Sequence, residues 1–221
     1  MKFPTEIKVL DSVYKVLYFN NASDVCIMGR YNKLYEVDFW TNEIRIFKDD
    51  NSVEFEIWNR IWVSLVDILF NKFHIYDIID PEVKDRHKAL FSMGISSVLM
   101  DNQIISNRKE FPKEVKIFDS KYFISYFDKA SQVDHGKRNS LFGQFDGWDC
   151  KINVYKGSYG TSDIWQTIWH EIVHGILDKL YLKLSENEVF VDLMATGINS
   201  IMSDNESFIN RFELGEQVQE K

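Results

Sequence analysis

Residues 3–25 read FPTEIKVLDSVYKVLYFNNASDV, and residues 111–133 read FPKEVKIFDSKYFISYFDKASQV. When one segment is shifted by 108 residues, the two are identical at 12 of 23 positions. Strand and helix patterning alone rarely produces so many identities in the same order. The repeated stretch therefore indicates an internal duplication.

The correspondence continues through both halves of the chain. Three further matches follow in the same order: Trp40 with Trp148, IWNRIW (57–62) with IWQTIW (164–169), and LFSMGISSVLMDN (90–102) with LMATGINSIMSDN (193–205). The sequence therefore predicts two domains of one kind, a first copy over residues 1–106 and a second copy over residues 107–221.

Each copy carries the same pattern of expected elements. β-Branched and aromatic runs separated by turn residues predict four strands per copy, and apolar residues at helical spacing then predict two helices. In the first copy the strands are expected at 6–10, 13–19, 35–38 and 43–47, and the helices near 55–69 and 81–100. In the second copy the strands are expected at 114–118, 122–127, 141–145 and 150–155, and the helices at 164–180 (with Ser162 as N-cap) and 186–202.

This order of elements predicts the fold class. Strands that precede helices in each copy are typical of the α+β class, in which helices pack on a small sheet. We expect two tandem copies of a small antiparallel sheet followed by two packed helices. Near-equal copies in one chain also predict a pseudo-two-fold pair that resembles a fused dimer. The sequence does not fix the oligomeric state, and a monomer with an internal pseudo-dimer is one state that fits it.

Composition and charge exclude several classes of protein. The net charge is −8 and no basic stripe is present, so nucleic acid is not an expected partner. No run of about 18 apolar residues predicts a membrane span, and the charged start MKFPTEIKVLDS is unlike a signal peptide. Two cysteines, Cys26 and Cys150, are too few for a disulfide framework or a thiolate metal site. We therefore expect a protein of the cytoplasm that does not bind membranes.

The second copy carries the motif His170-Glu171-Ile172-Val173-His174 inside its first predicted helix. Residues four apart on an α-helix differ by about 40° around the axis, so both imidazoles leave one face and can share a Zn²⁺ ion. Glu171 points about 100° further round, where it can accept a proton from a metal-activated water. The pattern predicts His170 and His174 as zinc ligands and Glu171 as the catalytic base.

The alternative for this motif is a pair of partly exposed histidines on a helix face, with Glu171 solvated. The first copy provides an internal comparison, because residues 63–67 read VSLVD where the second copy reads HEIVH. The apolar packing positions persist while the histidines and the glutamate are lost. The fold therefore does not require those side chains, and the first copy is predicted to bind no metal.

A third zinc ligand is expected from the second helix, which follows after a short turn. Glu188 is the predicted ligand, and Asp192, one turn later, is expected to accept the N–H of a zinc-bound histidine. The sequence Ser185-x-x-Glu188 also fits a capping box, in which Glu188 caps its own helix and Asp192 becomes the ligand instead. The equivalent positions in the first copy are Asp85 and Ala89.

A family resemblance rests on FPxEIK, the strand-rich region before the helices, IWHEIVHGIL and SENEVFVDLMATGINSIM. These segments resemble small phage- and prophage-associated HExxH zinc peptidases, broadly similar to the ImmA/IrrE and SprT-like groups. The resemblance implies a minimal zincin-like core that acts on a peptide or protein substrate, with His170, His174 and an acidic residue on zinc and Glu171 as base. The degenerate first copy is a departure from that pattern.

Two functions remain open from sequence. The first is zinc-dependent peptide hydrolysis. The second is a catalytically inactive binding protein of phage or prophage origin that keeps the peptidase fold with a vestigial or structural metal site. Four smaller expectations concern other residues. The paired tryptophans (58/62 and 165/169) are expected in the core or at an interface between the copies, and the tail after Asn205 is expected to form a short amphipathic helix. The remaining histidines are expected at the surface or in turns (His74, His87 and His135), and three tyrosines are candidate oxyanion donors (Tyr155, Tyr159 and Tyr181).

Overall fold

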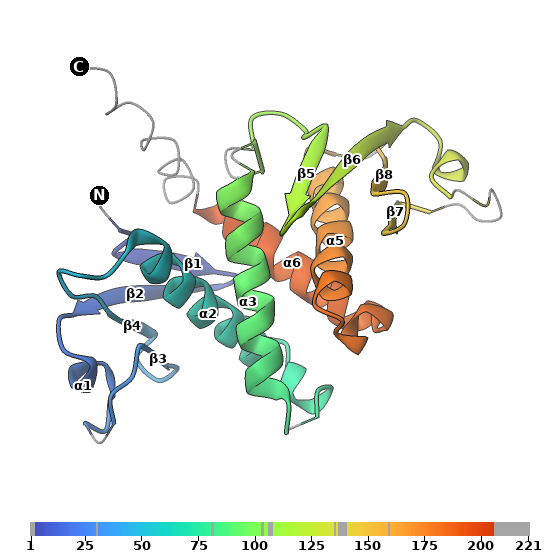
Figure 1. Cartoon of the computed structure of the whole chain (residues 1–221). Helices are drawn as coiled ribbons and strands as arrows, with labels where there is room; N and C mark the ends of the chain where they lie inside the picture. The colour runs from blue at the N-terminus through green and yellow to red at the C-terminus, as the bar shows by residue number, and fades with distance from the viewer. Residues whose placement is uncertain are drawn as a thin grey trace, which may run out of the picture. The chain divides into compact units, whose positions relative to one another are not determined.

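Figure 1 shows the computed structural model of the chain, which describes residues 3–29, 31–80, 82–102, 104–105, 108–134, 136, 141–158 and 160–205. Pro81, His135, Tyr159 and the predicted tail helix lie outside the described residues. The described residues fall into two compact units: unit 1 lies within Met1–Ser96 and Ser203–Phe208, and unit 2 lies within Ser97–Met202.

The two units have the same order of elements (Figure 1). The first set comprises β1 (Glu6–Val9), β2 (Ser12–Phe19), α1 (Ala22–Val25), β3 (Tyr35–Asp38), β4 (Glu43–Phe47), α2 (Glu54–Lys72), the short 3₁₀ helix η1 (Ile75–Asp77) and α3 (Lys84–Asp101). The second set comprises β5 (Glu114–Ile117), β6 (Ser120–Phe127), η2 (Ala130–Gln132), β7 (Gly143–Asp146), β8 (Lys151–Tyr155), α5 (Thr161–Lys179), η3 (Lys183–Glu186) and α6 (Glu188–Asp204). The α+β class, with two four-stranded sheets that are each followed by two helices, is confirmed.

The sheets are mixed rather than antiparallel. The strand orders are β1-β2-β4-β3 and β5-β6-β8-β7, and the central pairs β2–β4 and β6–β8 run parallel. The chain leaves β2, forms β3 at the far edge and returns as β4 beside β2, so consecutive strands β2 and β3 do not pair. A period-2 pattern identifies strands but does not identify their neighbours. As a result, β3 and β7 are edge strands.

Backbone conformation supports the duplication. Among the described residues, left-handed φ values occur at matching positions of the two units: Leu10 with Phe118, Asn42 with Cys150, and His74 with Tyr181. Non-glycine residues adopt this conformation infrequently, because Cβ crowds the backbone there. The same hairpin and helix-end geometry is therefore built twice from different side chains.

The first long helix of each unit packs its apolar stripe on the sheet. Trp58, Trp62, Trp165 and Trp169 are each at most 1% exposed, so the expectation that they lie in the core is confirmed. Each such side chain removes about 150–250 Å² from water, which makes these helices the main hydrophobic contribution of their units.

The start of α5 differs from the expectation. Gly160, rather than Ser162, is the N-cap, and its backbone N–H donates to the carboxylate of Asp163 at 3.3 Å. An acidic side chain at the third helical position compensates for a cap residue that has no side chain.

The repeated Asp-Asn at the end of each second helix binds the edge of a sheet. Asn205 follows α6 in sequence but belongs to unit 1. Its side-chain amide accepts from the Lys8 backbone N–H at 2.8 Å and donates to the Lys8 carbonyl at 2.7 Å. In unit 2 Asn102 makes the same pair with Lys116, at 2.7 and 2.8 Å. Each asparagine thus satisfies backbone groups that an edge strand would otherwise expose.

None of the described helices is long and apolar enough to cross a membrane.

Candidate metal centre

Helices α5 and α6 bring three metal-ligating side chains together in unit 2. The Nε2 atoms of His170 and His174 are 3.1 Å apart, and Glu188 Oε2 lies 3.3 Å from the first and 3.5 Å from the second. The histidines share one face of α5, and Glu188 begins α6. His170, His174 and Glu188 therefore form a group that could hold a metal ion.

The dimensions of this triangle suit a small tetrahedral cation. At bond lengths of about 2.0–2.1 Å, tetrahedral geometry places neighbouring ligand atoms about 3.3–3.4 Å apart. The three observed separations bracket that value. Two imidazoles and one carboxylate are also a donor set that zinc accepts, with a fourth position left for water or substrate.

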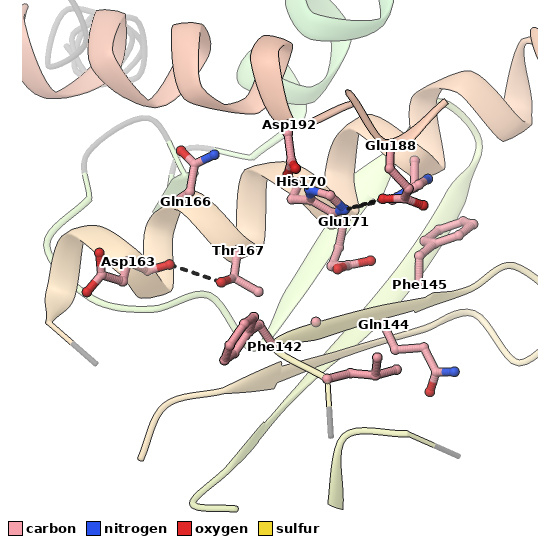
Figure 2. Close-up of a pocket in the computed structure, with 13 residues that line it drawn as sticks. Phe142, Gln144, Phe145, Asp163, Gln166, Thr167, His170, Glu171, Glu188 and Asp192 are labelled. Atoms are coloured by element: carbon pink, nitrogen blue, oxygen red, sulfur yellow. Dashed lines mark hydrogen bonds and ion pairs between the residues drawn. The ribbon is translucent and has the colours of Figure 1, made fainter. Parts of the chain in front are cut away.

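Each imidazole makes a further hydrogen bond that orients its ring. Asp192 Oδ1 lies 2.7 Å from His170 Nδ1, so that nitrogen donates to the carboxylate and Nε2 presents its lone pair to the centre. The ring of His174 donates to the backbone carbonyl of Ser185, and burial, followed by the neighbouring His170, lowers the pKa of His174. A neutral imidazole is the form that binds a cation. Figure 2 shows His170 lying between Asp192 and Glu188.

The capping alternative for Glu188 is wrong. Ser185 lies inside η3, α6 begins at Glu188, and the N-cap is Asn187, whose side chain accepts the Phe190 N–H at 3.1 Å. Glu188 is therefore the first residue of the helix, where its carboxylate is not needed for a capping box and points to the two histidines.

Glu171 is not solvated, in contrast to the alternative for this motif. Its side chain is 4% exposed, and burial raises the pKa of its carboxyl to about 8, with smaller contributions from the carboxylates of Glu188 and Asp192. The backbone N–H of Phe145 on β7 donates to it and opposes this effect. Figure 2 shows Glu171 pointing from α5 towards the strand that carries Gln144 and Phe145.

These groups line one cavity of about 700 Å³. Its lining includes the apolar side chains of Leu141, Phe142 and Phe145 as well as the two histidines and the carboxylates. Neither Tyr155 nor Tyr181 lines this cavity, and Tyr181 is 95% exposed, so these two are not placed to stabilise an oxyanion in it. The sequence did not predict the contacts of the Ser185 carbonyl with His174 and of the β7 backbone with Glu171. Both are made by backbone groups, which every residue type has.

Unit 1 holds an ion pair at the equivalent place. Asp67 corresponds to His174 and Asp85 to Glu188. The Lys88 ammonium lies 2.9 Å from Asp67 Oδ1 and 3.8 Å from Asp85 Oδ1. An internal cation therefore lies between the two residues that correspond to metal ligands.

Two tyrosines complete this cluster. The Tyr76 hydroxyl donates to Asp67 Oδ1, and the ring of Tyr35 lies with its centroid 6.0 Å from Lys88 Nζ. Burial raises the pKa of Tyr35, which keeps its hydroxyl neutral. Within the described part of unit 1, Lys88 and Tyr76 therefore contact the carboxylate of Asp67, the residue that corresponds to His174.

No protein-family model, curated protein or solved structure gives a significant match to this chain.

Asp192→Asn is expected to weaken zinc binding by about 10–100-fold, because His170 loses the carboxylate that orients it and raises its basicity. A competition titration with a chromogenic zinc chelator measures the change. Asp163→Asn is the matched control, since Asp163 lines the same cavity but its carboxylate binds Gly160 and neither histidine. Equal zinc affinity in the two variants would contradict the orienting role of Asp192.

Proposed function

We propose that unit 2 is a zinc-dependent peptidase that hydrolyses peptide bonds through a metal-activated water, with Glu171 as general base. The observation that carries this proposal is a buried carboxyl directly beside a converging His-His-Glu triad in one cavity. A structural metal site needs no such base, whereas hydrolysis does.

Each residue of the site has a separate task. His170, His174 and Glu188 would hold the ion, and Asp192 fixes the orientation of His170. Zinc would supply polarisation of a carbonyl and a water acidified towards pKa about 7. Glu171, buried in the same cavity, can accept a proton from that water and pass it to the leaving amine.

The edge strand β7 favours an extended polypeptide as substrate. The Tyr155 N–H donates to the Phe142 carbonyl, which makes these two a hydrogen-bonded antiparallel pair. Because such pairs alternate, the backbone groups of Gly143 and Phe145 point away from β8, and apart from the Phe145 N–H, which donates to Glu171, they can pair with an added strand. A peptide can add to such an edge through its own main chain, which suits cleavage with broad side-chain tolerance. We further infer that the protein acts in a reducing cytoplasm, since two cysteines in the whole chain are too few for a disulfide framework.

Zinc content and chelation test this function against a structural metal. The purified chain is expected to bind one zinc ion with unit 2 as the site, to lose it to a chelator without unfolding, and to lose casein hydrolysis at the same time. Elemental analysis, circular dichroism and a fluorescent casein assay measure the three properties. Unfolding on chelation would instead favour the binding protein with a structural ion, and hydrolysis that survives complete zinc removal would contradict the proposal.

A further inference from the structure

Gly143 lies where a side chain would collide with the general base. A Cβ built on Gly143 would overlap the Glu171 carboxylate, and it would lie 2.8 Å from Glu171 Cδ and 2.7 Å from Thr167 Cγ2. Real Cβ atoms essentially never approach other heavy atoms this closely. The strand β7 therefore passes α5 at a distance that only a residue without a side chain permits at this position.

Backbone conformation does not explain this glycine. Among the described glycines only Gly29 has a left-handed φ, so the backbone at Gly143 is open to any L-residue. Gly143 also pairs with Val154 in an ordinary antiparallel register. What Gly143 provides is space, and the Glu171 carboxylate fills most of it, with the Thr167 methyl group beside it.

In unit 1 the residue sizes are reversed at the positions equivalent to Gly143 and Glu171: the strand carries a large residue and the helix a small one. Tyr35 takes the place of Gly143 in the register, paired with Ile46 as Gly143 is with Val154. Ser64 takes the place of Glu171, and its hydroxyl turns back to the Arg60 carbonyl at 2.8 Å. Where the base is absent the strand carries a large, half-buried side chain, and where the base is present it carries none.

We propose that Gly143 is a positioning residue for catalysis: its missing side chain lets the Glu171 carboxylate lie under β7, within reach of the Phe145 N–H. This inference rests on the proposed peptidase function for its catalytic consequence, but the contact itself does not depend on that function. Glu171 is a flexible side chain, so a methyl group at position 143 would displace its carboxylate rather than the strand.

The test combines hydrolysis, zinc binding and a double-mutant cycle. Gly143→Ala is expected to lower kcat by about 100-fold with KM and zinc affinity nearly unchanged, since a displacement of about 1 Å at a reacting group has an effect of that size. Gly143→Ala is also expected to lower the Tm by several degrees in the wild-type background and by less in a Glu171→Ala background, where only the Thr167 methyl group remains in the way. Gly147→Ala is the matched control on the same hairpin, because its Cβ would meet nothing closer than 3.3 Å.

Each outcome decides the question. A Tm penalty that is the same with and without Glu171, or hydrolysis by Gly143→Ala at the level of the Gly147→Ala control, overturns the proposal. If Gly143→Ala does not fold, the triple variant Gly143→Ala/Glu171→Ala/Thr167→Ser, which also removes the Thr167 methyl group, must fold, and its failure to do so overturns the proposal as well. If the wild type hydrolyses no peptide, the peptidase function fails, while the Tm cycle still decides whether Gly143 makes room for Glu171.

Discussion

Glu171→Gln is expected to lower kcat for peptide hydrolysis by about 10²–10⁴-fold while zinc still binds with near wild-type affinity. Glutamine keeps the size of the side chain, but its amide cannot accept a proton from the attacking water, and general-base catalysis contributes about this factor. The three candidate ligands are untouched by the substitution. A fluorescent peptide assay at saturating substrate, with zinc content measured on the same preparation, checks both parts. Glu186→Gln is the matched control, because Glu186 is an exposed residue of η3.

The same variant has a consequence that needs no substrate. In the zinc-free protein the pKa of Glu171 is raised from 4.5 to about 8, so folding favours the protonated form. The stabilisation is complete below about pH 4.5, declines as pH rises towards 8, and is absent above it, with a slope of about 1.4 kcal/mol per pH unit at most. Glu171→Gln should remove this decline from the free energy of unfolding measured against pH. Wild-type hydrolysis by the glutamine variant would contradict the catalytic role, and an unchanged pH dependence would contradict the burial of the carboxyl.

The sequence predicted the elements of this fold better than their pairing. Alternating apolar residues such as Ile7, Val9, Val115 and Ile117 mark strand positions because each strand buries one face. The parallel contact of β2 with β4 was not predictable, because it depends on where β3 lies in space. In the same way, Ser162, the second residue of α5, was mistaken for the N-cap, since the true cap Gly160 has no side chain to indicate it.

In the candidate site, too, features set by local spacing were predictable and features set by the folded structure were not. The spacing of His170 and His174 follows from helical geometry, so their proximity was predictable from four residues of separation. The third group was ambiguous because Ser185-x-x-Glu188 satisfies two local rules, and the 3₁₀ helix before Asn187 decides between them. Gly143 lies 28 residues before Glu171, and it acts through its lack of a side chain, which no local pattern reveals. The one signal in the sequence is that the first copy has a large residue, Tyr35, at the equivalent position.

Lys88→Met is expected to destabilise unit 1 by about 3–5 kcal/mol, the cost of leaving one member of a buried ion pair without its partner. The side chains of Lys88 and Asp67 are only 10% and 18% exposed. Burial lowers the pKa of Lys88, but the Asp67 carboxylate outweighs burial and the pKa is raised, so the ammonium is charged at neutral pH. Methionine fills a similar volume but supplies no charge, and the Tyr76 hydroxyl alone does not neutralise the carboxylate.

Removal of both charges separates this cause from lost packing. Lys88→Met/Asp67→Asn should recover most of the stability, because a neutral amide costs far less to bury than an unpaired carboxylate. Lys121→Met is the control for a lysine in an ion pair at the surface, since Lys121 and Glu114 are 55% and 52% exposed, and its effect should stay within about 1 kcal/mol. Urea unfolding of each variant gives these differences. Equal losses for Lys88→Met and the double variant would mean that Lys88 contributes packing rather than charge. They would contradict the interpretation that unit 1 uses an internal cation at the position of the candidate metal site of unit 2.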